Sequence, residues 1–132
     1  MKTKSIRVFI HILAFTLATA ACGRSSPVKA FEAVFDAMRK RDVAALKKTF
    51  SKHELEKLEK AAHNASRSSD EVLAMVLDSY PERLPERLET RNVKIEGERA
   101  TLEFQAKTGD WKTANFAWED GEWKFLFEGF RP

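Results

Sequence analysis

The segment from Asn92 to Phe127 constrains the fold more than any other part of the chain. It contains four short runs in which apolar and polar residues alternate, and this period of two is typical of strands with one buried face. Short glycine-containing segments separate the runs, and the last of them, Asp120-Gly121, is a strong signal for a two-residue hairpin turn. The pattern predicts a four-stranded antiparallel sheet whose apolar face needs a covering layer.

Alternation also predicts which side chains share the covered face of this sheet. These are, strand by strand, Val93 and Ile95; Leu102, Phe104 and Ala106; Ala114, Phe116 and Trp118; Trp123, Phe125 and Phe127. Trp111 falls on the opposite face of the third strand. Leu126 lies opposite the aromatic residues of the last strand, so we expect that strand to be covered on both sides.

Residues 27–80 show helical periodicity and predict four helices. Four cap signals precede them: Ser26-Pro27, Asp42, Ser51 with Glu54, and Ser68 with Glu71, the last two in capping-box form. The expected inward residues are Val28, Phe31, Val34, Phe35 and Met38; Val43, Leu46 and Phe50; Leu55, Leu58 and Ala62; Val72, Met75, Val76 and Tyr80. After Pro81, Leu84 and Leu88 are expected to anchor a connecting turn. Helices followed by antiparallel strands indicate an α+β domain with its helices on one sheet face.

The first 21 residues have the features of an export signal, so we do not expect them to be part of this domain. Lys2, Lys4 and Arg7 form a basic start, and an uncharged apolar run from residue 8 to residue 21 follows. That run is too short for a comfortable membrane-spanning helix. We therefore expect a signal peptide over 1–21, a tether over 22–26 and one α+β domain over 27–132.

Cys22 is the one cysteine of the chain, and it stands where the signal would be cut. The run from Thr19 to Gly23 resembles the lipobox of bacterial lipoproteins, in which a lipidated cysteine becomes the new N-terminus, although Thr19 replaces the usual Leu. The resemblance implies a lipid anchor, palmitate included, and Gly23 implies the periplasmic face of the outer membrane. Cleavage before Ala21 is the alternative, because Ala18-Thr19-Ala20 also fits the A-x-A rule.

Charge argues against a nucleic-acid-binding protein. The formal net charge is +3 and the isoelectric point is about 9.1, but the three extra basic residues all lie in the signal. The remainder carries equal numbers of basic and acidic residues, whereas nucleic-acid binding requires a basic patch. We expect no nucleic acid among the partners.

Three segments carry a resemblance to a known family. They are the charged turn from Met38 to Asp42, the strand from Ala100 to Phe104, and the run W-E-D-G-E-W-K-F from Trp118 to Phe125. Together they resemble the nuclear transport factor 2-like (cystatin-like) α+β cone, and more narrowly small bacterial lipoproteins that carry a domain of unknown function with that fold. The resemblance implies a bent sheet that wraps the helices and often leaves a pocket at its wide end.

Little in the sequence indicates catalysis or a metal centre. His53-Glu54 begins like the zinc-protease motif, but Lys57 stands where the second histidine is required. Enzymes of the cone fold usually place Asp, His or Tyr in the pocket, and Asp78 and Tyr80 are further candidates here. No acid–base pair has a spacing that demands a role. We expect no metal and no cofactor.

Aromatic residues are the remaining candidates for a site. Trp111, Trp118 and Trp123 lie on adjacent strands, and Tyr80 ends the fourth helix. They can serve as packing, or they can line a pocket or interface for an apolar ligand or a partner. Trp111 is the best candidate for an exposed aromatic because it points away from Phe116.

Three hypotheses about function follow from the sequence. The first is a membrane-anchored, non-catalytic domain of the cell envelope that binds a small ligand or an envelope protein. The second is an envelope enzyme of the isomerase or dehydratase type that uses the cone pocket. The third is a structural envelope protein whose exposed sheet face is its interface.

Overall fold

The computed structural model describes residues 25–127. The predicted signal and Cys22 lie outside the described residues. The elements, in chain order, are α1 (Pro27–Lys40), α2 (Val43–Thr49), α3 (Lys52–Asn64), α4 (Ser69–Ser79), the 3-10 helix η1 (Pro81–Arg83), β1 (Thr90–Glu96), β2 (Arg99–Gln105), β3 (Trp111–Glu119) and β4 (Glu122–Leu126). The α+β class and the helices-then-strands order are as expected.

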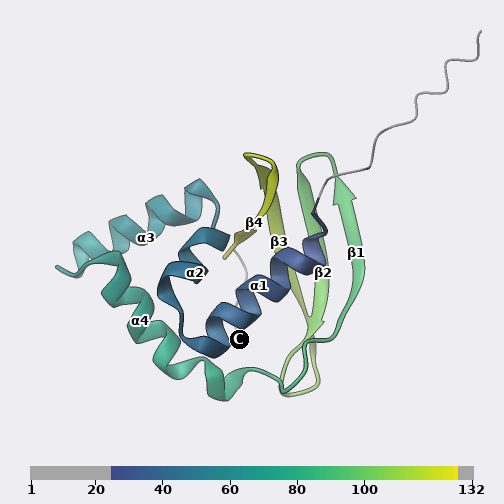
Figure 1. Cartoon of the computed structure of the whole chain (residues 1–132), viewed down its shortest axis with the longest axis horizontal. Coiled ribbons are helices and arrows are strands. Elements are labelled where there is room, and N and C mark those ends of the chain that lie inside the picture. The colour runs from purple at the N-terminus through teal and green to yellow at the C-terminus, as the bar shows by residue number, and fades with distance from the viewer. Residues whose placement is uncertain (1–24, 128–132) are drawn as a thin grey trace, which may run out of the picture.

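Helices cover one face of the sheet in two tiers. Figure 1 shows α1 crossing the sheet with α2 beside it, while α3 and α4 lie further from the strands. α1 contacts β1, β2 and β4, and α2 contacts β4, whereas α4 packs against α2 and α3. The first two helices therefore form the covering layer, and the other two support them.

The sheet is an antiparallel meander in the order β1-β2-β3-β4. Its last turn has the geometry that the sequence predicts: Asp120 has φ 51° and Gly121 has φ 81°, as a type I′ hairpin requires. Glu119 pairs with Glu122 across this two-residue turn. The register places Trp118 beside Trp123 and Phe116 beside Phe125, so the aromatic residues of the hairpin share the covered face.

β1 departs from the expected alternation. A bulge interrupts its pairing with β2 between Arg91 and Lys94, and Asn92 takes φ 51° at that point. Val93 and Ile95 were expected to be covered, but they are 42% and 53% exposed. The helical layer is centred on the other strands, so it leaves the edge strand largely open (Figure 1).

Helix caps follow the sequence signals with one exception. Ser26, Asp42, Ser51 and Ser68 all accept a bond from a backbone N–H of the first turn, and Ser68 forms the complete capping box with Glu71. The predicted box at Ser51 is wrong in its second half. The Ser51 N–H donates to the Phe125 carbonyl at 3.2 Å, so it is unavailable to Glu54, whose side chain is buried instead.

The predicted inward face of α4 is right for Tyr80, which is buried, and for Val76, which packs against the core, but it is wrong for Met75 and omits two leucines. Met75 is 57% exposed, whereas Leu73 and Leu77 are buried at 4% and 1% exposure. Apolar residues occupy nearly every position from 72 to 77, so several stripes fit the spacing equally well. Because α4 packs against α2 and α3, the stripe that contains the two leucines is the one that is buried.

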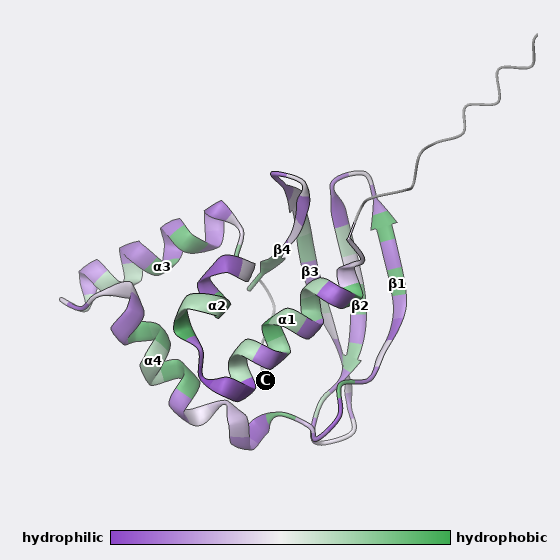
Figure 2. Ribbon diagram, in the orientation of Figure 1, coloured by the Kyte–Doolittle hydropathy of each residue, from purple (hydrophilic) through white to green (hydrophobic). Residues whose placement is uncertain are grey.

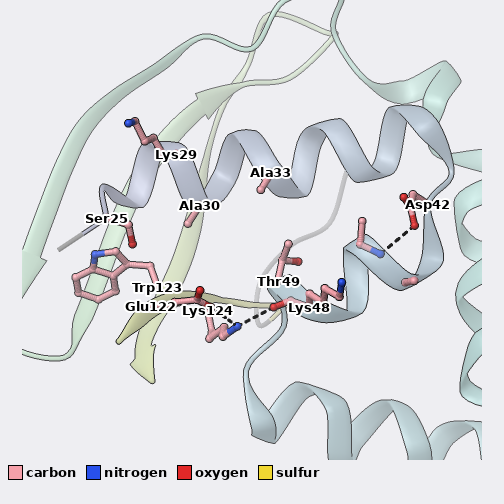
Figure 3. A pocket seen from close by; sticks show the side chains of 12 residues that line it. Ser25, Lys29, Ala30, Ala33, Asp42, Lys48, Thr49, Glu122, Trp123 and Lys124 are labelled. Atoms are coloured by element: carbon pink, nitrogen blue, oxygen red, sulfur yellow. Dashed lines mark hydrogen bonds and ion pairs between the residues drawn. The ribbon is translucent and has the colours of Figure 1, made fainter. Parts of the chain in front are cut away.

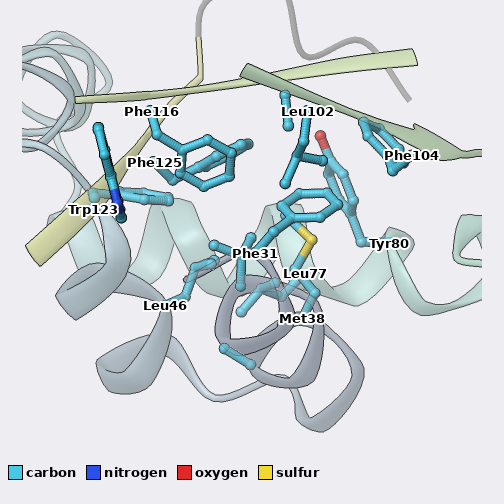
Figure 4. Close-up of a cluster of buried hydrophobic side chains, with 14 of the residues drawn as sticks. Phe31, Met38, Leu46, Leu77, Tyr80, Leu102, Phe104, Phe116, Trp123 and Phe125 are labelled. Atoms are coloured by element: carbon cyan, nitrogen blue, oxygen red, sulfur yellow. The ribbon is translucent and has the colours of Figure 1, made fainter. Parts of the chain in front are cut away.

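The core lies between the sheet and α1 and is rich in phenylalanine (Figure 4). Phe31 of α1 is central to it: its ring centroid lies 4.9 Å from that of Phe104, 6.0 Å from Phe116 and 5.9 Å from Phe125. Figure 2 shows the corresponding pattern on the ribbon, with mixed hydrophobic and polar stripes on α1 and α4 and a mostly hydrophilic α3. Leu126 is 7% exposed, which confirms that the end of β4 is covered on both faces, whereas Glu122 at its start is exposed.

Candidate functional site

The interior between α1 and the sheet is filled. Phe116 and Phe125 have no exposed surface, and Leu102 has none either. A hollow remains where Phe35 and Met38 of α1 approach Leu84 and the end of β2, but its volume is only about 30 Å³. That is room for about one water molecule, so the described interior does not accommodate a substrate.

A larger hollow lies outside this interior, between α1, α2 and the start of β4. We call it the α1–β4 groove (Figure 3). Its volume is about 450 Å³, within the range of small-molecule sites. Its lining residues are Ser25, Lys29, Ala30, Ala33, Asp42, Ala44, Ala45, Lys48, Thr49, Glu122, Trp123 and Lys124. Four of the lining residues are alanines, whose small side chains occupy little of the space between α1 and α2.

The groove has an apolar floor and a charged rim. Figure 3 shows Ala30 and Ala33 directed from α1 into the hollow, with Trp123 and Ser25 at one end and Asp42 at the other. The Asp42 carboxylate accepts the Ala45 N–H at 2.9 Å as the cap of α2. Its charge is therefore already engaged at the helix start.

Two rim residues of β4 form an ion pair. Lys124 Nζ lies 2.8 Å from Glu122 Oε2 and also donates to the Lys48 carbonyl at 2.8 Å. The hydrogen bond and the positive charge of Lys124 lower the pKa of Glu122. This pair joins the β3–β4 hairpin to the end of α2 and shapes one wall of the groove.

Trp123 carries an unpaired polar atom at the end of the groove. The residue is 3% exposed, and its Nε1–H has no hydrogen-bond partner among residues 25–127. In Figure 3 the ring nitrogen is on the edge of the indole that faces Ser25. A buried donor without an acceptor costs about 1–3 kcal/mol, so an acceptor supplied here would be stabilising.

The structure brings two of the four predicted site residues together. The rings of Trp118 and Trp123 pack edge to face with centroids 5.0 Å apart. Trp123 is buried and lines the groove, whereas Trp118 is half-buried behind it. Trp123 is therefore a packing residue that also lines the groove.

Trp111 and Tyr80 lie elsewhere. Trp111 is half-buried on the uncovered face, and the guanidinium of Arg91 lies 3.9 Å from its ring centroid. Tyr80 is 8% exposed in the core, and burial raises the pKa of its hydroxyl, which the charge of Arg83 partly offsets. Neither residue lines the α1–β4 groove.

The sequence analysis missed the alanines and Lys48 as site residues. The sequence does contain small residues at helical spacing that could have indicated the groove. Ala30 and Ala33 are three residues apart on α1, and Ala44 and Ala45 lie in the first turn of α2. Small residues at such positions do not indicate by themselves whether two helices close against each other or leave a hollow. That outcome depends on how α1 and α2 meet, which local sequence does not encode.

A second open hollow of about 450 Å³ lies beside the β2–β3 turn, between Glu82 and Asp110. Lys107 spans it by donating to the Glu82 carbonyl at 2.6 Å. No aromatic residue lines it, so the α1–β4 groove is the stronger candidate.

Within residues 25–127, no group of three or more metal-ligating side chains is close enough to hold an ion. None of the helices in that range has the length and hydrophobicity to cross a membrane. Comparisons of the chain with protein-family models, with curated proteins and with solved structures find no match in any of the three.

Proposed function

We propose that this chain is a lipoprotein of the cell envelope whose α+β domain is a non-catalytic binding module. Cys22 is the lipidated residue, and the lipid holds the domain at the periplasmic face of a membrane, by preference the outer one. The domain binds a small ligand or an envelope partner protein through the α1–β4 groove. The single observation that carries the binding half of this proposal is the open groove beside a filled interior.

The nature of the groove lining supports binding over catalysis. An apolar floor with a few charged groups at the rim is typical of recognition sites. Glu122 and Lys124 are in contact, but they form an ion pair in which the Glu122 side chain is 67% exposed. Isomerases and dehydratases need ionisable groups that converge on an enclosed substrate, so the filled interior favours the non-catalytic reading.

We further propose that the fold is a variant of the nuclear transport factor 2-like cone in which aromatic side chains occupy the interior. The support is the order of helices before an antiparallel meander and the aromatic hairpin from Trp118 to Phe125. In such a variant the binding surface lies at the side of the cone, along α1, and not at its wide end.

Fractionation of cells tests the anchor. The wild-type protein is expected in the membrane fraction, and Cys22→Ser in the soluble exported fraction, because the substitution removes the atom that carries the lipid. Ser25→Ala is the matched control on the same tether and should stay in the membrane. An unchanged membrane location of Cys22→Ser would overturn the lipoprotein half of the proposal.

Crosslinking in intact cells tests what the domain binds. A small-ligand module yields no stoichiometric protein adduct, whereas a partner-binding module yields one adduct of defined mass. A partner adduct that persists when Ala33→Phe fills the groove would place the interface elsewhere and support a structural role for the uncovered sheet face.

A further inference from the structure

We propose that the α1–β4 groove binds a single-chain anionic lipid. The acyl chain lies on the alanine floor, and the acidic head group lies at the end formed by Lys29, Trp123 and Lys124. This inference deepens and rests on the proposed function of a membrane-anchored binding domain.

The shape of the groove suits a narrow apolar chain. Ala30 and Ala33 of α1 and Ala45 of α2 all line the groove, so its floor is a trough between two helices. Small side chains leave space along the helices without forming a pocket of defined outline. Such a space suits a flexible acyl chain better than a rigid ring system. A trough of small residues is not by itself evidence that a ligand binds. Two further observations support a ligand in this groove.

The first is the balance of charge at the rim. Lys29 and Lys48 form no ion pair within the described part of the chain, whereas Glu122 is paired with Lys124 and Asp42 caps α2. The acidic side chains are engaged and two ammonium groups are free. The rim is therefore complementary to an anion.

The second is the indole of Trp123. Within the part of the chain that the structure describes, its N–H is buried without an acceptor, and it lies on the ring edge facing Ser25, at the lysine-rich end of the groove. A carboxylate or phosphate oxygen at this end would accept that hydrogen bond. Of the two unpaired lysines, Lys29 lies at the same end of the groove as this donor, whereas Lys48 lies nearer Asp42 (Figure 3).

The position of this end favours a lipid over a free anion. Ser25 lines the groove and is three residues beyond Cys22, and three extended residues span at most about 11 Å. With Cys22 lipidated, the lysine-rich end is held close to the bilayer surface. A single-chain lipid leaving the membrane would enter the groove there.

Titration followed by tryptophan emission tests this inference. The probes are dodecanoate, which has chain and charge, dodecanol, which has the chain alone, and inorganic phosphate, which has charge alone. The protein is the full chain exported with Cys22→Ser, so that its own acyl groups do not compete. We expect saturable binding of dodecanoate, binding of dodecanol at least about tenfold weaker, and no response to phosphate.

Two pairs of variants locate the site. Ala33→Phe should weaken dodecanoate binding at least about tenfold by filling the trough, whereas Ala74→Phe, on the exposed face of α4, should not. Lys29→Ala should weaken it roughly twofold to fivefold, and Lys60→Ala, an exposed lysine of α3, should leave it unchanged. Circular dichroism of each variant checks that the fold is retained.

Several outcomes would overturn the inference. They are absence of dodecanoate binding, equal affinity for dodecanol, binding of phosphate alone, or an Ala33→Phe variant that binds as wild type does. If the membrane location still depends on Cys22 and another compound occupies the groove, these outcomes do not contradict the proposed function. The proposed function fails separately, when the anchor is absent and the groove is empty in protein from cells.

Discussion

Trp123 has two opposing effects on the stability of the fold. Its ring packs against Trp118 and fills the sheet end of the core, which is stabilising. Its N–H is buried without an acceptor among the described residues, which is destabilising. Such a residue is typical of a binding site, where a polar group that lowers the stability of the free protein is able to contact a ligand.

Substitution of Trp123 separates these effects. Trp123→Ala should lower the free energy of unfolding by about 3–5 kcal/mol because it empties a buried site. Trp123→Phe keeps an aromatic ring and removes the unpaired donor, so we expect a loss of about 1 kcal/mol or less. Urea denaturation measures both, and a Trp123→Phe loss as large as that of Trp123→Ala would show that the indole N–H makes a stabilising bond.

Glu71 gives a prediction for pH. The backbone N–H and hydroxyl of Ser68 both donate to its carboxylate and lower its pKa below the ordinary value of 4.5. A lowered folded-state pKa means that the contribution to stability is complete above pH 4.5 and is lost as the pH falls through the lower, folded-state value. The difference in the free energy of unfolding between wild type and Glu71→Gln should therefore be largest near pH 7 and shrink towards pH 3.

The control for this effect is Glu56→Gln. Glu56 is an exposed residue of α3 without a cap role, so its difference from wild type should change little over the same range. A Glu71→Gln difference that grows on acidification would contradict the capping account.

At the level of elements, the β3–β4 hairpin determines how the groove is built. It places Trp123 in the core and Lys124 at the carbonyl of Lys48, which links β4 to α2. The turn depends on left-handed backbone at Asp120 and Gly121. Sequence alone predicts this feature because Asp-Gly between alternating runs has few other conformations.

A substitution in this turn should report on the hairpin without touching any side chain. A Cβ at Gly121 meets nothing within 4 Å, so Gly121→Ala acts through the backbone alone. We expect a loss of about 1–2 kcal/mol, because φ of 81° is unfavourable for alanine. Asp120→Asn should be close to neutral, since Asn-Gly also favours this turn. Equal effects of the two variants in thermal denaturation would argue against the type I′ geometry.

The edge strand shows where element-level prediction fails. Alternation in β1 predicts that Ile95 is covered, but the pattern does not reveal how far α1 extends over the sheet. Ile95→Thr is therefore expected to change the free energy of unfolding by less than about 0.5 kcal/mol. Leu102→Ala, at the neighbouring buried strand, should cost about 2–5 kcal/mol. A large effect of Ile95→Thr would mean that β1 is covered in the intact protein.

At the scale of the whole molecule, the sequence predicts the class and order of elements but not the location of the site. Caps at Ser26, Asp42 and Ser68 and the Asp120-Gly121 turn act through local bonds, so they can be identified locally. The orientation of Met75 on α4 and the role of Glu54 depend on contacts with other elements, and these two expectations were wrong for that reason.

The placement of a hollow depends on the whole fold. The expected aromatic residues are divided among the core, the uncovered face and the groove, and only Trp123 reaches the groove lining. The resemblance implies a pocket, but the interior between α1 and the sheet is occupied by residues such as Phe31 and Phe104. A cavity is the space left after every side chain has packed, so no short segment of sequence specifies it.

The central claim is that the α1–β4 groove is a binding site, and one measurement tests it most directly. The wild-type protein and Ala33→Phe are purified from cells in parallel, with Ala74→Phe as the matched control, and co-purified small molecules are identified by mass spectrometry. We predict one compound at about one per chain with wild type and Ala74→Phe, and its loss from Ala33→Phe. The same set of compounds on all three proteins, or none on any of them, would contradict the claim.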